Sequence, residues 1–248
     1  MKLLFDIGNS TVDWAIEDGK KFIQSGKFRY GTGRFIEQLE QNIEITTVPS
    51  AVLVSNVAGE ELVNTLSDWV DRKWQLKIWQ AEVTKSFSEL KNSYQDIRQM
   101  GIDRWLAMIA AWTKFKSAIC VVGCGTALTI DLIDKSGGHL GGYIIPGVEV
   151  MQQALITKTD KIKVTPMSDV SIAYANNTQA AINNGSCLAA VAMIDYCVEK
   201  LRNDLNIEPR CIITGGMAKQ IKTYLQSSFD YEQNLVLQGL SIMHKASQ

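Results

Sequence analysis

Two short segments, half a chain apart, share one design that constrains how this chain can fold. Residues 5–13 and 123–131 each carry an apolar β-type run, then a glycine beside small polar residues, then a second β-type run. Glycine permits positive φ angles and lets another group approach the backbone closely. Each segment therefore predicts a strand, a tight turn and a returning strand. The pair predicts two lobes that grip one phosphorylated ligand.

The simpler interpretation of each hairpin is a β-turn without function, because Asn and Gly are ordinary turn residues. Two features favour function. The design occurs twice, and Asp6 directly follows the apolar run Leu3, Leu4 and Phe5. A carboxylate is rarely buried at such a place without a cation or hydrogen-bond partners.

Composition narrows the class of protein. The 248 residues are 46% hydrophobic, and the net charge of −1 argues against a nucleic-acid or anionic membrane surface. The longest apolar candidate, 118–130, is shorter than the roughly 18 residues of a membrane span. The apolar run after Met1 is too short for a secretory signal, so we expect a cytoplasmic protein with no membrane partner.

Residue types also limit the chemistry. The five cysteines include no CxxC pair, so neither a zinc site nor a disulfide framework is predicted. The only histidines are His139 and His244, which leaves carboxylates to carry acid–base chemistry.

The predicted elements repeat one order along the chain. Hydrophobic periodicity predicts strands at 2–7, 12–17, 21–28, 51–55 and 76–79, with helices at 33–41, 60–72 and 103–116. It then predicts strands at 119–122, 127–133, 139–145, 211–214 and 235–237, with helices at 147–156, 178–202 and 217–225 and a short helix after the last strand. This order predicts an α/β protein of two similar lobes, 1–116 and 117–248, with a cleft between them. Residues 84–100 are expected to be irregular, and 160–171 are expected to form a mobile loop.

The tetrapeptide Gly101–Arg104 begins the predicted helix at 103–116. Asp103 there could be an N-cap, which is favourable beside the positive end of the helix dipole. With Arg104 directly after it, Asp103 could instead place a proton acceptor beside an anion-binding group. Both interpretations stay open at this point.

Two Gly-Gly pairs, at 141–142 and 215–216, lie in or after predicted strands. They are either plain turns or places where the backbone approaches a nucleobase or ribose. No Walker A lysine signature is present, and no GxGxxG follows a strand, so neither a P-loop nor a Rossmann nucleotide site is predicted.

With these motifs in place, the chain resembles type III pantothenate kinases over nearly its whole length. The matching motifs, in order, are Asp-Ile-Gly-Asn-Ser, Tyr94 before Gly-Ile-Asp-Arg, Gly-Thr-Ala-Leu-Thr-Ile-Asp, Gly-Gly-Tyr-Ile-Ile-Pro-Gly and Asn-Thr-Gln-Ala-Ala-Ile-Asn-Asn-Gly. The resemblance implies two actin-like (ribonuclease H-like) lobes, each a mixed sheet with flanking helices. It also implies transfer of the ATP γ-phosphoryl group to pantothenate, the first step toward coenzyme A.

The resemblance implies a role for particular residues of the ATP site. Asp6 would be oriented toward Mg²⁺, Thr126 would touch an ATP phosphate, and the second Gly-Gly pair would lie near adenosine. The ATP-binding set would be Asp6, Ile7, Gly8, Asn9, Ser10, Thr11, Val12, Asp13, Gly125, Thr126, Gly215 and Gly216.

It likewise implies a pantothenate pocket, with Asp103 as the proton acceptor and a homodimer in which Thr178 reaches the neighbouring subunit's substrate. The substrate-binding set would be Tyr94, Gly101, Ile102, Asp103, Arg104 and Thr178. Phosphoryl transfer needs mainly positioning and charge neutralisation, so the scarcity of histidine is no obstacle.

One position departs from the family pattern. The second hairpin of the family usually begins Asp-x-Gly-Thr, and that aspartate helps to bind an activating K⁺ or NH₄⁺ ion. Gly123 stands there in this chain, so we expect weakened or absent dependence on a monovalent cation. Two alternatives to pantothenate kinase activity remain. The first is a kinase for another small hydroxylated acid or sugar, and the second is a non-catalytic nucleotide-binding regulator.

Overall fold

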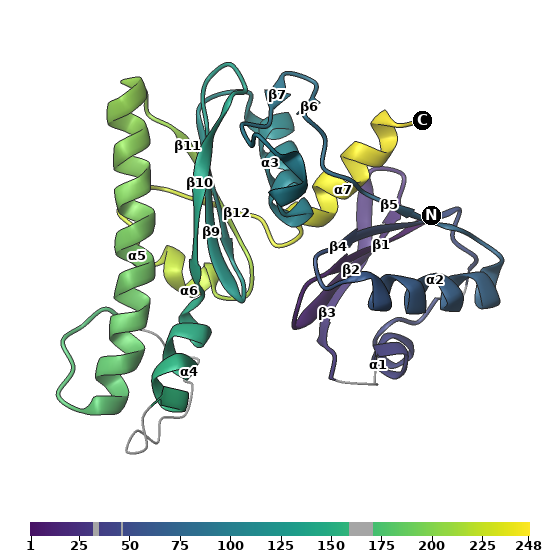
Figure 1. Ribbon diagram of the computed structural model, residues 1–248, viewed down its shortest axis with the longest axis horizontal. Helices are drawn as coiled ribbons and strands as arrows, with labels where there is room; N and C mark the ends of the chain where they lie inside the picture. Colours follow the sequence, from purple (N-terminus) through teal and green to yellow (C-terminus); the bar gives the residue numbers. More distant parts are fainter. Residues whose placement is uncertain (32–34, 46, 159–170) are drawn as a thin grey trace. The chain divides into compact units, whose positions relative to one another are not determined.

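A computed structural model describes residues 1–31, 35–45, 47–158 and 171–248 (Figure 1). The chain forms two compact units. Unit 1 contains Met1–Lys85, Tyr94–Ala110 and Asn234–Gln248, and unit 2 contains Ser86–Ser93 and Ala111–Gln233. The units are discontinuous in sequence, whereas the division expected above was a single cut after residue 116. The C-terminal segment groups with unit 1.

Unit 1 is built on a five-stranded mixed sheet in the order β3-β2-β1-β4-β5. β1 pairs antiparallel with β2 and parallel with β4, so the N-terminal strand lies at the centre. The elements are β1 (Lys2–Ile7), β2 (Thr11–Asp18), β3 (Lys21–Arg29), α1 (Phe35–Asn42), β4 (Ala51–Asn56), α2 (Glu60–Trp74) and β5 (Ile78–Gln80).

The two faces of this sheet follow from the alternation of side chains along β1. Leu3, Phe5 and Ile7 belong to the core that includes Phe35 of α1 and Leu66 of α2. Figure 1 shows α1 and α2 beside this sheet. Side chains alternate along a strand, so Asp6 shares the opposite face with Leu4.

Unit 2 repeats the same topology. Its sheet has the order β10-β9-β8-β11-β12, with β8 antiparallel to β9 and parallel to β11. The elements are β8 (Ile119–Cys124), β9 (Ala127–Ile133), β10 (His139–Pro146), α4 (Val148–Lys158), α5 (Thr178–Leu205), β11 (Arg210–Thr214), α6 (Ala218–Lys222) and β12 (Asp230–Tyr231). The predicted topological repeat is therefore confirmed.

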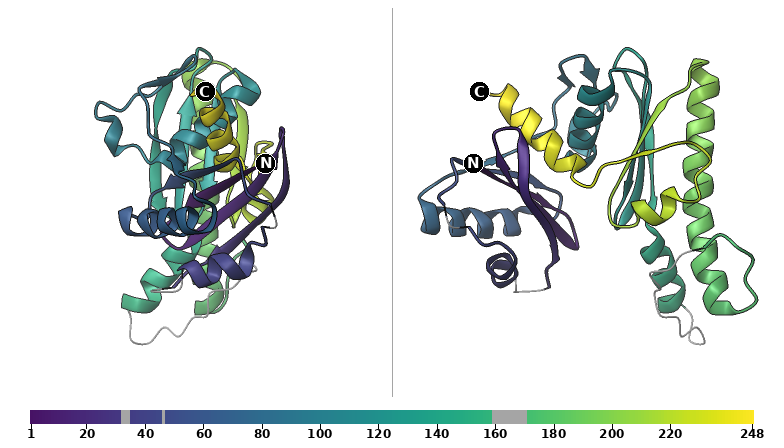
Figure 2. Two further views of the ribbon diagram at one scale, coloured as in Figure 1. Left: turned by 90° about the vertical axis from the view of Figure 1, so that its right-hand side faces the viewer. Right: turned by 180° about the vertical axis from the view of Figure 1, so that it is seen from behind.

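The long helix α5 covers one face of the unit 2 sheet, and the view from behind in Figure 2 shows it running alongside the strands. Cys187, Val191, Ile194 and Val198 of α5 belong to the same buried core as the strand residue Val122. By length and composition α5 could cross a membrane, but half of its most apolar window is buried within the protein. Packing on the sheet accounts for that apolar face. All five cysteines are buried and free.

One predicted strand is wrong. Residues 235–237 form the first turn of α7 (Leu235–Ala246), and the last strand of the second repeat is the short β12. The buried side chains of α7 include Leu237, Leu240 and His244, whose spacing is helical. Three residues were too few to distinguish this period from that of a strand.

The segment 84–100, which was expected to be irregular, contains three short elements: β6 (Ser86–Phe87), β7 (Leu90–Lys91) and a 3₁₀ turn at Ile97–Gln99. The helix that follows it, α3 (Ile102–Phe115), starts one residue earlier than expected. The expected loop at 160–171 lies outside the described residues except for Ser171, and so do Gly33 and Arg34 of the expected first helix.

Candidate functional site

The first hairpin turns tightly between β1 and β2. The Gly8 N–H donates to the Thr11 carbonyl at 2.9 Å, and the Tyr30 hydroxyl donates to the Gly8 carbonyl at 2.6 Å. Asn9 and Ser10 are exposed at the tip. These bonds fix the turn with Asn9 and Ser10 accessible at its tip.

Asp6 ends this apolar strand in an unusual electrostatic environment. The residue is partly buried, and its Oδ1 atom is buried without a hydrogen-bond partner among the described residues. Burial, the nearby Asp103 carboxylate and then Asp13 raise the pKa of Asp6 to about 7, against the opposing effects of Ser55 and Lys27. Ser55 stands opposite Asp6 on β4, and Lys27 pairs with Asp13 at 2.9 Å. A carboxyl group in this state gains from a cation beside it.

Asp103 lies in the first turn of α3, and its carboxylate occupies the space that a side chain at Gly101 would need. A Cβ atom at position 101 would lie 2.5 Å from Asp103 Oδ1. The Trp105 N–H donates to the Gly101 carbonyl, so Gly101 is the residue from which the helix starts. The N-cap interpretation of Asp103 is therefore wrong. The missing side chain at Gly101 lets the carboxylate lie over the backbone.

Tyr94 and Arg104 meet within unit 1. Arg104 Nη1 donates to the Tyr94 hydroxyl at 2.9 Å, and the guanidinium carbon lies 5.7 Å from the centre of the Tyr94 ring. Only 5% of Arg104 is exposed. Lys85 Nζ donates to the Tyr94 carbonyl at 2.9 Å. A nearly buried guanidinium held by an aromatic ring can recognise an anionic group.

The second hairpin, between β8 and β9, is braced by two glycines of unit 2. The Gly147 N–H donates to the Thr126 carbonyl at 2.8 Å, and a side chain at Gly147 would overlap the backbone of Gly125 and Thr126. Gly215, at φ +103°, packs in the same way against the backbone of Cys124. Gly125 and Thr126 themselves are exposed. The predicted ATP residues of unit 2 are thus brought together by backbone contacts.

The position of Gly123 shows how the chain accommodates the departure from the family pattern. Gly123 stands opposite Thr129 on β9, and a Cβ atom at position 123 would lie 2.7 Å from Thr129 Oγ1. The threonine therefore fills the space where an aspartate side chain would begin. The nearby Asp131 is paired with His139 at 3.0 Å.

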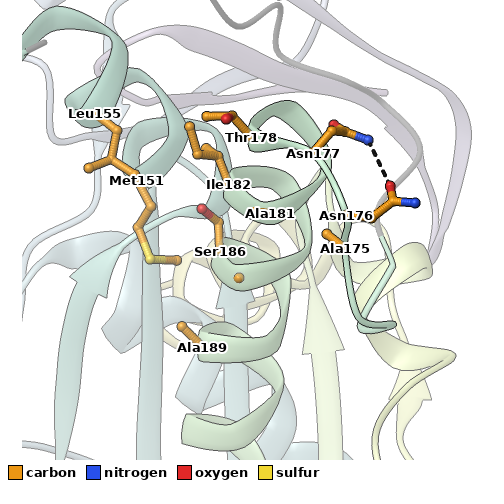
Figure 3. A pocket seen from close by; sticks show the side chains of 11 residues that line it. Met151, Leu155, Ala175, Asn176, Asn177, Thr178, Ala181, Ile182, Ser186 and Ala189 are labelled. Atoms are coloured by element: carbon orange, nitrogen blue, oxygen red, sulfur yellow. Dashed lines mark hydrogen bonds between the residues drawn. The ribbon is translucent and has the colours of Figure 1, made fainter. Parts of the chain in front are cut away.

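Thr178 begins α5 and lines a groove of unit 2 (Figure 3). The groove has a volume of about 760 Å³, and its lining includes Met151 and Leu155 of α4 with Ile182 and Ser186 of α5. The Asn177 side chain accepts from the Ala180 N–H at 2.9 Å and so caps the helix. None of the other predicted site residues is among those that line this groove.

Sequence reasoning missed three groups around these sites. Ser55 and Lys85 act on Asp6 and Tyr94, but neither belongs to a recognisable motif. Thr129 lies inside the second motif, yet its contact with position 123 depends on strand register. The polar end of β4, Ser55-Asn56, was the one available signal for a functional strand end.

Comparison with known proteins identifies the relatives of this chain. The sequence profile of the type III pantothenate kinase family matches residues 2–200. A type III pantothenate kinase of Nitrosococcus oceani is 34% identical, with 99% of this chain and 94% of the relative covered. Another, of Hahella chejuensis, is 31% identical, with 99% and 98% covered.

Solved structures agree on the fold. A Campylobacter jejuni protein assigned to the Baf family of transcriptional activators has a TM-score of 0.62 at 22% identity, with 99% of this chain and 98% of the other covered. MreB 5 of Spiroplasma citri has a TM-score of 0.53 at 12% identity, with 99% and 96% covered. At such identities these likenesses show the fold alone, which is the expected actin-like α/β fold.

The raised pKa of Asp6 predicts how Asp6→Asn changes stability with pH. The native carboxyl binds its proton more tightly than the unfolded one, so its contribution to stability is present below pH 4 and is lost as pH rises through about 7. Asn cannot ionise, so the variant should melt at a higher temperature than the parent at pH 8 and gain least at pH 5. The gain should be a few kcal/mol at most, at about 1.4 kcal/mol per pKa unit.

Thermal melting of both proteins from pH 5 to 8, without nucleotide or divalent metal, measures this difference. Asp18→Asn, at an exposed carboxylate of the same sheet, is the control. A melting difference for Asp6→Asn that does not grow with pH would show that Asp6 is ionised throughout.

Proposed function

The chain belongs to the type III pantothenate kinase family, and from this premise we propose how its residues carry out the reaction. It is a phosphotransferase that phosphorylates pantothenate with ATP in coenzyme A biosynthesis, giving 4′-phosphopantothenate. As in kinases generally, the nucleotide acts with a divalent metal. The roles of individual residues, the metal's identity and the assembly are the proposal.

One observation carries the assignment of the reacting centre. Within unit 1 the Asp103 carboxylate lies close enough to Asp6 to raise the pKa of Asp6. Asp103 is the proton acceptor for the pantothenate hydroxyl, and Asp6 faces the metal. The two roles can be tested separately because Asp103 lies on helix α3 and Asp6 on strand β1. A substitution at one position therefore leaves the backbone that carries the other in place.

Mg²⁺ fits the residues present. Asp6 offers a buried carboxylate oxygen that no described residue hydrogen-bonds, and a cation there would relieve the repulsion between Asp6 and Asp103. Among the described residues no group of three or more acidic, histidine or cysteine side chains could hold a metal. That suits Mg²⁺, which takes one or two carboxylates and completes its shell with phosphate oxygens and water. The ion would supply charge neutralisation at the transferred phosphoryl group.

The remaining ATP contacts come from the hairpins. Residues Ile7 to Asp13 and the pair Gly125 and Thr126 hold phosphate through backbone N–H groups and short hydroxyls. Gly215 and Gly216 lie near adenosine, where a glycine backbone permits close approach. Gly101, Ile102 and Arg104 line the pantothenate pocket with Tyr94. The Arg104 guanidinium is suited to the pantothenate carboxylate.

The assembly is a cytoplasmic homodimer in which Thr178 completes the partner's pocket. Two exposed apolar side chains on α5 are available to such an interface. They are Leu188, which is 48% exposed, and Tyr196, which is 63% exposed.

Purified protein with ATP, Mg²⁺ and pantothenate tests the activity itself, with 4′-phosphopantothenate detected by mass spectrometry. Other small hydroxylated acids and sugars are offered in separate reactions. Turnover of one of these in place of pantothenate would contradict the assigned substrate, and nucleotide binding without turnover of any of them would support a non-catalytic role.

Asp103→Asn should lower turnover by about 10²- to 10⁴-fold, the usual range for a general acid–base group. The substitution keeps the shape that Gly101 accommodates, so nucleotide binding and melting temperature should change little at pH 6. It also removes a charge that raises the pKa of Asp6, so that pKa should fall. Initial rates and pH-dependent melting measure the two effects.

Asp96→Asn, at a carboxylate that pairs with Arg98 in the same segment, is the control. Near-normal turnover of Asp103→Asn would leave Asp103 with only a structural role.

The composite site predicts that two defective proteins repair each other. When Asp103→Asn and Thr178→Ala chains are mixed and exchange subunits, half of the dimers should be mixed, and each mixed dimer holds one site without a lesion. About a quarter of the parental activity should return, as follows from the two-fold symmetry of such dimers. Sedimentation establishes the dimer. A fully active monomer, or no recovery after demonstrated exchange, would contradict the shared site.

Dependence on a monovalent cation should be weak or absent. Gly123 supplies no carboxylate, Thr129 fills the adjacent space, and Asp131 is engaged by His139. Initial rates with sodium or Tris as the sole monovalent cation, followed by titration of potassium and ammonium, measure the dependence. Activation of tenfold or more at low millimolar potassium would show that other residues build the cation site.

A further inference from the structure

A chain of three hydrogen-bonded polar side chains in unit 2, two of them buried and the third exposed, ends one residue before Tyr94. His139 Nε2 lies 3.0 Å from Asp131 Oδ1, and His139 Nδ1 lies 3.0 Å from Ser93 Oγ. The side chains of His139 and Asp131 are 0% and 3% exposed. The mechanism proposed above uses none of these three groups.

The protonation pattern follows from the chemistry of the acceptors. In the tautomer that carries the ring proton on Nε2, this N–H donates to the Asp131 carboxylate. Nδ1 then accepts from the Ser93 hydroxyl. In this arrangement the three side chains form one continuous chain of hydrogen bonds from Ser93 to Asp131.

A β-bulge beside His139 allows its side chain to join this chain of hydrogen bonds. β10 has a register shift between His139 and Gly141, where Gly141 takes φ +121° and Leu140 is half exposed. Such bulges re-aim side chains and recur next to functional sites. Here His139 is turned into the protein although it begins an edge strand.

The hairpin of β6 and β7, which Ser93 follows in the chain, contacts the rest of unit 2 at several further points. The Lys91 N–H donates to the Gly137 carbonyl at 2.8 Å, and Trp112 Nε1 donates to Glu89 at 3.3 Å. A side chain at Gly137 would lie 2.6 Å from the Glu89 carbonyl oxygen, so the hairpin packs closely there. Ser93 is the last residue before the chain enters unit 1 at Tyr94.

We propose that Ser93, His139 and Asp131 are positioning residues that set Tyr94 for recognition of pantothenate, an inference that rests on the proposed role of Tyr94. Tyr94 is held on its unit 1 side by Lys85 at its carbonyl and by Arg104 at its hydroxyl. The Ser93 bond fixes the peptide on its other side. The chain acts through Tyr94 on the acceptor substrate and leaves ATP binding unaffected.

The test is a double-mutant cycle of Ser93→Ala and Tyr94→Phe, read as KM for each substrate and as kcat. Ser93 is exposed, so its truncation should not disturb folding. Ser93→Ala should raise KM for pantothenate three- to tenfold and leave KM for ATP within twofold. Ser93→Thr, which keeps the hydroxyl, should restore the parental value. In the Tyr94→Phe background the effect of Ser93→Ala should shrink to less than twofold.

His139→Gln probes the middle of the chain. Its amide can still donate to Asp131, so the buried carboxylate keeps a partner, but the acceptor facing Ser93 is lost. It should reproduce the pantothenate KM of Ser93→Ala and add nothing to it. Ser88→Ala, whose hydroxyl donates to the adjacent Glu89 at the turn between β6 and β7, is the matched control and should match the parent.

The outcomes separate this proposal from the function on which it rests. An unchanged pantothenate KM in Ser93→Ala, equal rises for both substrates, or full additivity with Tyr94→Phe would overturn the positioning role. A Tyr94→Phe protein with parental pantothenate KM would instead remove Tyr94 from the pocket. Absence of pantothenate turnover in the parent protein would overturn the function.

Discussion

The burial of one carboxylate oxygen at the end of the central strand of unit 1 is the constraint on which the site depends. In the part of the chain that the structure describes, Asp6 Oδ1 has no hydrogen-bond partner, and Asp103 and Asp13 add negative charge nearby. A fold does not gain stability from this arrangement, because desolvation and like charges both disfavour the ionised form. In the proposed function, this arrangement serves to bind a cation. The tight Gly8 turn and the bare Gly101 backbone are needed to hold the carboxylates in place.

The two units share one topology but differ in charge at equivalent positions. Asp6 stands two residues before Gly8, opposite Asp13 and Ser55, whereas Gly123 stands two residues before Gly125, opposite Thr129 and Thr214. Unit 1 therefore concentrates carboxylates where unit 2 presents hydroxyls and bare backbone. This difference supports the proposal that a cation binds beside the first hairpin, whereas the second hairpin offers only N–H and O–H groups to phosphate.

The sequence allowed the two hairpins and the repeated topology to be predicted, because a glycine turn between apolar runs is a local signal. The error at 235–237 has an equally local cause, since three apolar residues fit a strand and the first turn of a helix alike. The partners that tune the site could not be predicted. Ser55 meets Asp6, and Ser93 meets His139, only through strand pairing and packing between distant segments.

These long-range partners explain why a motif alone underdetermines a site of this kind. The Tyr94 and Arg104 pair is local in sequence, yet Tyr94 is held by Lys85 on one side, and its neighbour Ser93 is held by a buried imidazole on the other. Truncating a motif residue removes a contact, whereas truncating a support changes the geometry in which the contact is made. Binding and turnover respond differently to these two changes. The kinetic constants for each substrate therefore distinguish a residue that contacts pantothenate from a residue that positions such a contacting side chain.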